Sequence, residues 1–505
     1  MARLVVTIQR DDRKTAMLMS AVTWDQRLAE RWLWFNHWVV ALAVVYVLVC
    51  SSVSVAGAKE PANRVPNFVV ILMDDMGWRD VGFMGNEFVE TPHLDSLARR
   101  GVVFSQAYAS APNCAPTRAC LLSGQYTPRH GIYTVVDPRQ PVGSPWHKLM
   151  AAESKSELAT DVVTLAEALK TGGYDTGFFG MWNLGRGRSG PVTPGGQGFR
   201  RVVFPDTIGF GKDAYFDKQG RYLSDRLTDE VLSFIEQNRE RPFFVYLADH
   251  AVHAPWEPKA GLREKYVKKR AAMERPGRGD DPDYAATIAA VDENVGRIVE
   301  ALQRWKLTDN TMVIFTSDNG GTSQFTAPLN GGKGQLYEGG IRVPLVMTGP
   351  GVKHAGSTCQ VPVSSVDLYP TLLEMARLTA PHGQVLDGVS LVPALQGEGE
   401  LRRERLFWHF PCYVGKAPPS SAMREGKWKL VEFFEDGGHV ELYNLEADPN
   451  ERKDLAKSLP ERAEAMHRVL RAWQQQTGAA VPRTPNPDYD PKSSRPRGRN
   501  PKTLN

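Results

Sequence analysis

The segment from Cys114 to Arg118 holds side chains well suited to catalysis. It reads Cys-Ala-Pro-Thr-Arg and continues into a short apolar stretch. Pro116 fits the first turn of a helix over residues 116–122, and Gly124 is a typical helix stop. Residue 114 then lies at a helix N-terminus, where free N–H groups and the helix dipole favour an anion. Arg118, one turn further along, can hold an oxyanion through charge-assisted hydrogen bonds.

A cysteine at the start of a helix has a second interpretation. A lowered pKa would make Cys114 a thiolate nucleophile, as in redox proteins and cysteine hydrolases. That chemistry uses a histidine partner, and the sequence shows no Cys-His pairing pattern. The thiolate therefore stays as an alternative and not as the main interpretation.

Acidic and amide side chains follow two apolar stretches that are predicted to be buried strands. Asp74 and Asp75 come directly after FVVILM, and Asp318 and Asn319 follow TMVIFT after one serine. In open α/β sheets, ligands bind beyond the carboxyl ends of the strands. Carboxylate and amide oxygens without a nearby Cys or His cluster favour Ca²⁺ or Mg²⁺ over Zn²⁺. One Asp-Asp pair alone could equally be a turn or a helix cap, so the cation site is predicted from both strand ends together.

Strand and helix patterns alternate from residue 66 to about residue 375. Continuous apolar runs, as in residues 68–73, are typical of buried parallel strands. Apolar residues at spacings of three and four, as in residues 288–302, predict helices with one buried face. This alternation predicts an α/β fold in which a large, mostly parallel sheet is flanked by helices.

The composition changes after about residue 380. The strand-like segments 427–433 and 439–444 flank Gly437-Gly438 and predict an antiparallel hairpin, and residues 460–476 predict a helix. The tail is rich in Pro, Arg, Asn and Ser, which predicts disorder. We therefore divide the chain into an N-terminal extension (1–58), a catalytic domain (66–380), a smaller C-terminal α+β domain (381–480) and a disordered tail (481–505).

The N-terminal extension contains a targeting pattern. Residues 38–55 form a nearly continuous apolar run that follows Arg27 and Arg31 and precedes Ala56-Gly57-Ala58. Basic residues, an apolar run and small residues in this order predict a secretory signal, and therefore export to the periplasm or out of the cell. The alternative is an uncleaved membrane anchor, because the run has about the 18 residues needed to span a bilayer.

Composition narrows the class of partner. Of the 505 residues, 42% are hydrophobic, which is enough for a large core. The net charge of +4 is close to balanced, whereas nucleic-acid-binding proteins carry a concentrated basic excess, so we expect no nucleic-acid partner. Cys114 and Cys120 are too far apart along a helix to form a disulfide, while a Cys359–Cys412 disulfide is left open.

With these elements in place, the Cys-x-Pro-x-Arg core resembles the signature of the type I sulfatases. The resemblance covers about residues 66–475 and implies an alkaline-phosphatase-like fold with a smaller C-terminal α+β domain. Further segments in the family's order are similar: residues 67–80 with the paired aspartates, 90–97, 243–258 around His253, 330–344 around Lys333, 422–430 and 441–455.

The resemblance implies a modified nucleophile and a metal. In this family a separate maturation enzyme oxidises the cysteine, here Cys114, to formylglycine, whose hydrate is the nucleophile. Asp74, Asp75, Asp318 and Asn319 would bind one divalent cation, by resemblance Ca²⁺ in preference to Mg²⁺. The modified residue 114 would share that cation.

The resemblance also implies roles for three further residues. Arg118 would orient the hydrate, Lys333 would hold a sulfate oxygen, and His253 would protonate the departing alcohol. One hydroxyl of the hydrate attacks sulfur and expels the alcohol. Loss of the proton from the other hydroxyl then expels sulfate and regenerates the aldehyde, so one hard displacement becomes two easier ones.

One family segment is altered in this chain. Where the family has Gly-Lys-Trp-His-Leu-Gly, residues 180–185 read Gly-Met-Trp-Asn-Leu-Gly. Met181 replaces a lysine that contacts sulfate, which predicts a rate loss of about 10²–10³. Asn183 replaces a histidine that helps to remove the second proton of the hydrate, and general-base assistance is typically worth about 10²–10⁴. Arg186 or Arg188 could supply the missing charge, or could be solvated loop residues.

Three functions are compatible with these substitutions. The favoured one is a working sulfatase with an altered pocket, which acts on sulfated carbohydrates or aryl sulfates and whose activity these two substitutions could reduce. The second is a weak or inactive protein that binds sulfated glycans, and the third is a related phosphate or phosphonate ester hydrolase. The alcohol part of the substrate is not specified: Trp256, Trp408, His409 and Tyr413 could line a sugar site or belong to the core.

Overall fold

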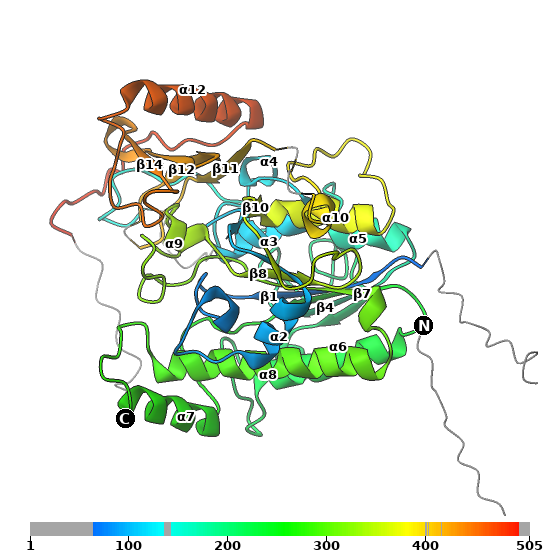
Figure 1. Cartoon of the computed structure of the whole chain (residues 1–505). Coiled ribbons are helices and arrows are strands. Elements are labelled where there is room, and N and C mark those ends of the chain that lie inside the picture. The colour runs from blue at the N-terminus through cyan, green and yellow to red at the C-terminus, as the bar shows by residue number, and fades with distance from the viewer. Residues whose placement is uncertain (1–63, 136–142, 399–400, 402, 416, 494–505) are drawn as a thin grey trace, which may run out of the picture. The chain divides into compact units, whose positions relative to one another are not determined.

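Eight strands form the central sheet, in the order β5 (Arg201–Val203), β4 (Asp175–Gly180), β6 (Phe243–Ala248), β1 (Asn67–Met73), β7 (Thr311–Ser317), β8 (Leu345–Thr348), β2 (Val102–Phe104) and β9 (Ser357–Cys359) (Figure 1). The structure is a computed structural model that describes residues 64–135, 143–398, 401, 403–415 and 417–493. Strand β8 runs antiparallel to β7 and β2, and the other neighbouring pairs are parallel. The predicted α/β fold with a mostly parallel sheet is confirmed.

The strands at the centre of the sheet are buried on both faces. Every residue of β1, β6 and β7 is buried, which explains why their sequences are mainly apolar and do not alternate with polar residues. Successive side chains of β1 point to opposite faces: Val69 and Ile71 belong to one hydrophobic core, and Phe68 and Val70 belong to another. The sheet therefore separates two cores.

Helices cover both faces of the sheet (Figure 1). The core on one face includes residues of α2 (Pro92–Arg100), α6 (Leu223–Gln237) and α8 (Pro282–Arg304), with α7 (Ala260–Ala271) packed on α8. The core on the other face includes residues of α3 (Cys114–Ser123), α5 (Leu165–Thr171) and α10 (Leu368–Met375). The predicted apolar face of α8 is confirmed, since its residues at spacings of three and four are buried: Ile288, Val291, Val295, Ile298 and Leu302.

A second, antiparallel sheet lies in the C-terminal part of the chain. Its strands, in order, are β11 (Arg405–Phe410), β12 (Ser420–Glu425), β13 (Trp428–Phe433) and β14 (Val440–Asn444), and α12 (Pro460–Thr477) packs on it. The hairpin predicted around Gly437-Gly438 is the β13–β14 pair. Both glycines have positive φ angles, 84° and 90°, which turns the chain at no steric cost.

The boundary between the two sheets differs from the predicted one. From Val65 onward the chain is one compact unit. Helix α11 (Val392–Leu395) follows the predicted boundary at 380/381, yet Leu391, Ala394 and Leu395 pack in the core of the large sheet. The second sheet begins only at β11, and Leu391, Ala394 and Leu395 before it belong to the first core.

The segment 481–493, predicted to be disordered, contacts the body of the protein. Pro485 pairs with Leu149 in an isolated β-bridge, and the Asn486 amide donates to the backbone oxygens of Ser144 (3.0 Å) and His147 (2.9 Å). A composition rich in Pro and Asn therefore does not exclude order here, because backbone groups of residues 144–149 supply hydrogen-bond partners. The remainder of the tail lies outside the described residues.

Several predictions concern residues that the structure does not describe. The signal or anchor segment in 1–58 lies outside the described residues. Among the residues that are described, no helix is long and apolar enough to cross a membrane.

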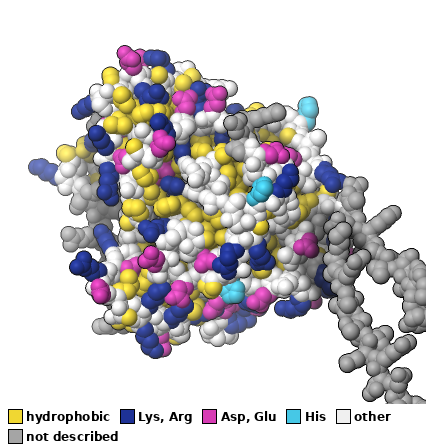
Figure 2. All heavy atoms as spheres, in the orientation of Figure 1, with side chains coloured by type: hydrophobic (Ala, Val, Ile, Leu, Met, Phe, Trp, Pro, Cys, Tyr) yellow, Lys and Arg dark blue, Asp and Glu magenta, His cyan; other side chains and the backbone are white. Residues whose placement is uncertain are grey.

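The described cysteines Cys114, Cys120, Cys359 and Cys412 are all free, so the Cys359–Cys412 disulfide is not formed. On the face in Figure 2, Lys and Arg side chains are interspersed with Asp and Glu.

Candidate active site

Helix α3 presents Cys114 at its N-terminus. The helix begins at Cys114, two residues earlier than predicted, and Pro116 is its third residue. The Asn113 side chain caps the helix by accepting a hydrogen bond from the Cys114 N–H at 2.8 Å. Gly124 ends the helix in the left-handed conformation (φ 69°), as predicted. Capping residues on both sides therefore fix the buried Cys114 at the carboxyl edge of the sheet.

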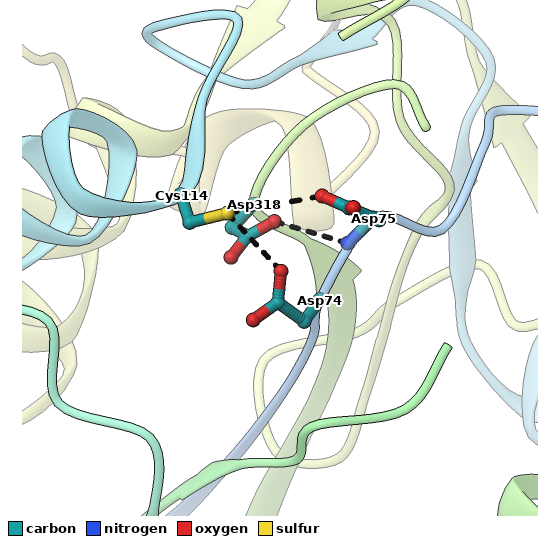
Figure 3. A group of neighbouring side chains, drawn as sticks. All are labelled: Asp74, Asp75, Cys114 and Asp318. Atoms are coloured by element: carbon teal, nitrogen blue, oxygen red, sulfur yellow. Dashed lines mark hydrogen bonds between the residues drawn. The ribbon is translucent and has the colours of Figure 1, made fainter. Parts of the chain in front are cut away.

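Carboxylates from two adjacent strands surround the Cys114 thiol (Figure 3). Strands β1 and β7 are parallel neighbours that end in register, so the residues that follow them meet. Cys114 Sγ lies 3.1 Å from Asp74 Oδ1 and 3.7 Å from Asp75 Oδ1. The Asp75 N–H donates to Asp318 Oδ1 at 3.2 Å. The tertiary structure thus brings together the two strand ends that the sequence singled out.

The three carboxylates of this cluster fit a hard cation. One ligand atom from each of Asp74, Asp75, Cys114 and Asp318 lies within 4.8 Å of the others, and all four residues are buried. Oxygens that share one Ca²⁺ at about 2.3–2.6 Å must lie within roughly twice that distance of each other. Burial raises the pKa of Asp318 to about 7, and the negative charge of Asp74 adds to this rise. Carboxylates this close and this buried need positive charge to remain ionised together.

The surroundings of Cys114 disfavour the thiolate alternative. Burial raises its pKa well above the ordinary value, and the charges of Asp318 and Asp74 raise it further. A nucleophilic cysteine needs the opposite shift. The described cysteine that does contact a histidine is Cys120, 3.4 Å from His130 Nε2, but burial raises the pKa of Cys120 too.

Arg118 is a buried cation between the two strand ends. Its guanidinium donates to Asp318 Oδ2 at 2.8 and 3.0 Å and to Asp74 Oδ2 at 3.1 Å, and a third nitrogen donates to the Met181 carbonyl. The side chain is 1% exposed. Its charge partly balances the carboxylates, and its fork geometry fixes their orientation.

Asn319 lies in the cluster in a specific amide orientation. Its nitrogen donates to Asp75 Oδ1 at 2.7 Å and to Asp318 Oδ1 at 2.8 Å, while its oxygen accepts from the Gly321 N–H at 3.0 Å. A cation ligand would be the amide oxygen, because the NH₂ group has no lone pair to offer. Ligation by Asn319 therefore requires a half rotation of this amide.

Lys333 and His253 reach the same cluster from separate loops. Lys333 Nζ lies 2.6 Å from Asp75 Oδ1, and His253 Nε2 lies 3.7 Å from Asp75 Oδ2. His253 Nδ1 lies 2.7 Å from the Ala254 carbonyl, which makes it the protonated nitrogen and turns Nε2 toward the site. Direct contacts thus join the eight residues to which the sequence assigned catalysis or cation binding: Asp74, Asp75, Cys114, Arg118, His253, Asp318, Asn319 and Lys333.

The altered segment borders a pocket beside the cluster. Gly180 ends β4 with a φ of 114°, and a Cβ there would lie 1.9 Å from the Ala248 oxygen, so only glycine allows this approach. The pocket has a volume of about 690 Å³ and is lined by Met181 and Asn183 together with the basic residues Arg186, Arg188 and Lys212. The Met181 carbonyl accepts from Arg118, so this pocket with a basic wall adjoins a residue of the cluster.

The two arginines proposed as substitutes for the missing lysine differ in their contacts. Arg188 pairs with Asp206, and its guanidinium carbon lies 4.4 Å from the centre of the Phe204 ring. Arg186 lines the pocket without an ion-pair partner among the described residues, and so does Lys212. In the part of the chain that the structure describes, neither arginine pairs with a carboxylate of the cluster, so the charge of the missing lysine is not restored at the same point.

The sequence left open whether four residues line a sugar site or belong to the core, and it missed one histidine near the site. Trp408 and His409 are 1% exposed and belong to the interior. Trp256 packs against Tyr284 and Phe325. His250, three residues before His253, is buried beside the site, and the only signal that could have found it was its place in the same loop.

Comparison with known proteins identifies the family of this chain. A family model described as Sulfatase matches residues 66–378, and one described as N-sulphoglucosamine sulphohydrolase, C-terminal, matches residues 332–476. A sulfatase of Formosa agariphila is 32% identical, over 85% of this chain and 92% of its own length. Human arylsulfatase A is 30% identical, over 83% of this chain and 89% of its own length. The crystal structure of Ps i-CgsB is 30% identical, with a TM-score of 0.69 over 82% of this chain and 94% of that chain.

The chain therefore belongs to the sulfatase family. Its described fold, with the large mixed sheet and the small antiparallel C-terminal sheet, is the sulfatase fold. The relatives are named as sulfatases, enzymes that hydrolyse sulfate esters, and the buried Asp/Cys cluster could bind a metal ion.

Proposed function

We propose that this chain hydrolyses sulfate esters of carbohydrates, with residue 114, matured from cysteine to formylglycine, as the nucleophile. The observation that carries the proposal is the placement of Cys114, buried at the start of α3 and in contact with Asp74 and Asp75. A thiol with a raised pKa has no evident use there. An aldehyde hydrate at the same position would place its oxygens beside a cation and a helix N-terminus.

Asp74, Asp75 and Asp318 would hold the cation together with residue 114, and Asn319 would join them after rotation of its amide. We propose Ca²⁺, because carboxylate and amide oxygens are its preferred ligands. The cation supplies Lewis-acid stabilisation of the charge that develops on the sulfate oxygens.

The remaining roles follow from the contacts of three side chains. Arg118, already fixed by Asp74 and Asp318, orients residue 114. Lys333 offers an ammonium at the cluster edge for a sulfate oxygen. His253 presents Nε2, with Nδ1–H held by a carbonyl, so its protonated form can give a proton to the departing alcohol.

The sugar part of the substrate would lie in the pocket beside Met181. Arg186 and Lys212 lack ion-pair partners among the described residues, and their charges suit an anionic carbohydrate. The structure of Ps i-CgsB in complex with k-i-k-neocarrahexaose, 28% identical with a TM-score of 0.68, is a carbohydrate complex of a similar fold. A formylglycine-generating enzyme is the implied maturation partner. We also propose that the N-terminal segment directs export of the protein.

The proposal is tested on protein purified from its native host. Peptide mass spectrometry across residue 114 should show a loss of about 18 Da relative to cysteine, the change from thiol to aldehyde. The same protein should release sulfate from 4-nitrophenyl sulfate and from sulfated galactose or N-acetylgalactosamine, and it should act more slowly on 4-nitrophenyl phosphate and phenyl phosphonates. An unmodified thiol, or faster turnover of the phosphorus esters, would contradict the proposal.

A second candidate is a protein that binds sulfated glycans without turnover. The observation that favours it is the absence of a lysine at 181 and of a histidine at 183, which weakens two expected steps. Equilibrium binding of a sulfated oligosaccharide, with residue 114 modified and no sulfate released over a day, would support this candidate in place of the enzyme.

A further inference from the structure

His250 is a buried histidine whose ring nitrogens are both unpaired. The residue is 2% exposed, and no described group hydrogen-bonds its Nδ1 or Nε2. Buried polar side chains in folded proteins nearly always have a partner, because an unpaired buried donor or acceptor costs about 1–3 kcal/mol. An imidazole left in this condition beside a candidate active site indicates that its partner is a ligand or a reacting group.

The sheet order places His250 between the altered segment and the carboxylate cluster. Strand β6 lies between β4 and β1, and His250 is the second residue after β6. On one side, the Met181 N–H donates to the Ala248 oxygen at 2.9 Å. On the other, the Asp74 N–H donates to the Ala251 oxygen at 2.9 Å. The turn that carries His250 is therefore held by backbone bonds to both neighbouring strand ends.

The groups that face His250 belong to the site and to the pocket. The centres of the Tyr215 and His253 rings each lie 5.2 Å from the centre of the His250 ring. Burial lowers the pKa of His250, and the charges of His253 and Arg118 act in the same direction, while Asp74 and Asp213 oppose them. A lowered pKa favours the neutral imidazole, which keeps one nitrogen free to accept a proton.

We infer that His250 is the general base that completes the reaction. It takes the role that Asn183 cannot fill, because an amide is not a base. This inference rests on the proposed sulfatase activity. A ring nitrogen of His250 takes the proton from the free hydroxyl at residue 114. The electron pair of that O–H bond forms the C=O bond, the C–O bond to the sulfate group breaks, and sulfate leaves with the electron pair of that bond. His250 then returns the proton to solvent.

His253 is the competing acceptor, because it is left deprotonated after it protonates the alcohol. The two histidines have different surroundings, however. His253 Nδ1 is held by the Ala254 carbonyl and its side chain is 34% exposed, whereas His250 is enclosed and unpaired. Substitution of His250 alone shows which of the two histidines accepts the proton, because His253 is left unchanged.

The test compares His250→Gln with the parent enzyme and with His147→Gln, a control at a half-buried histidine stacked on Tyr413. Each protein is first checked for the loss of about 18 Da at residue 114 and for its melting temperature. We expect His250→Gln to release one equivalent of phenol from an aryl sulfate rapidly and then to turn over about 10²–10⁴ more slowly. Intact mass spectrometry should show a trapped sulfate group of about 80 Da that the parent and control do not accumulate.

Two further measurements test the role of His250: rescue of turnover by a second substitution, and an NMR spectrum of the ring nitrogens. Adding Asn183→His to His250→Gln should restore turnover and remove the trapped adduct. In the unaltered protein, ring-¹⁵N spectra at pH 7 should show His250 as a neutral imidazole, a readout that needs neither turnover nor modification. A doubly protonated ring, or His250→Gln with parental turnover and no adduct, would overturn the inference. A parent enzyme without the aldehyde or without any phenol release would instead overturn the proposed function.

Discussion

At the scale of single residues, Met181 shows how one position can keep its structural role while its side chain changes. Its carbonyl accepts from Arg118 and its N–H donates to the Ala248 oxygen, and any residue can supply these backbone groups. Its side chain lines the pocket, where the family has a lysine. The change therefore removes one cation from the anion site without disturbing the backbone around it.

Restoring that cation should raise activity. We expect Met181→Lys to increase kcat/KM for aryl sulfates by up to about 10², because an added ammonium would stabilise charge on the sulfate in the transition state. Met181→Leu, which keeps the volume and adds no charge, is the matched control and should leave kcat/KM unchanged. Rates are normalised to the fraction of residue 114 that carries the aldehyde. Lower activity in Met181→Lys would show that the pocket has adapted to methionine.

At the scale of elements, a buried ion cluster couples the C-terminal sheet to the loop that carries Lys333. Lys429 on β13 lies 2.9 Å from Glu338 and 2.8 Å from Glu451, and all three side chains are at most 1% exposed. Glu338 begins helix α9 (Glu338–Ile341), which directly follows the glycine-rich stretch with Lys333. The small sheet thus supports the position of a candidate catalytic lysine.

Removing the central cation should destabilise the whole protein. Lys429→Met leaves two buried carboxylates without their shared partner, and breaking a buried pair typically costs about 3–5 kcal/mol. Lys427→Met is the control, because Lys427 is half-exposed and its pair with Glu446 should be worth less than about 1 kcal/mol. The free energy of unfolding in urea measures both. Equal effects of the two substitutions would show that the buried cluster contributes no more to stability than the exposed pair does.

At the scale of the whole molecule, the candidate cation site joins parts of the chain that are far apart in sequence. It takes ligands from the end of β1, the start of α3 and the end of β7, which are separated by up to 244 residues. A cation bound there holds these three elements together only in the folded state. Binding should therefore stabilise the fold as well as support catalysis.

Chelation should lower the stability of the protein. At a hundredfold excess over Kd, one cation adds about 2.7 kcal/mol to the free energy of unfolding, so EGTA should reduce the melting temperature and Ca²⁺ should restore it. Asp75→Asn should abolish the Ca²⁺-dependent shift, while the exposed Asp309→Asn should retain it. A melting temperature that changes with neither EGTA nor Ca²⁺, or that changes only with Mg²⁺, would contradict the proposed calcium site.

The sequence by itself determined the features that depend on local pattern. Apolar runs such as residues 68–73 specified buried strands, Gly437-Gly438 specified a hairpin, and Asp74 with Asp318 marked the strand ends where ligands bind. These features could be predicted because burial on both faces, positive φ angles and strand termini each favour particular residue types over a few neighbouring positions.

Only the tertiary structure decided which groups are paired and which are left without a partner. The unpaired ring of His250, the amide orientation of Asn319 and the ion cluster of Lys429 depend on residues brought together from distant segments. Lys429 and Glu338, for example, are 91 positions apart. A local sequence pattern records what a residue is able to bind, but burial and long-range packing determine whether the protein itself supplies that partner or leaves the place to a substrate.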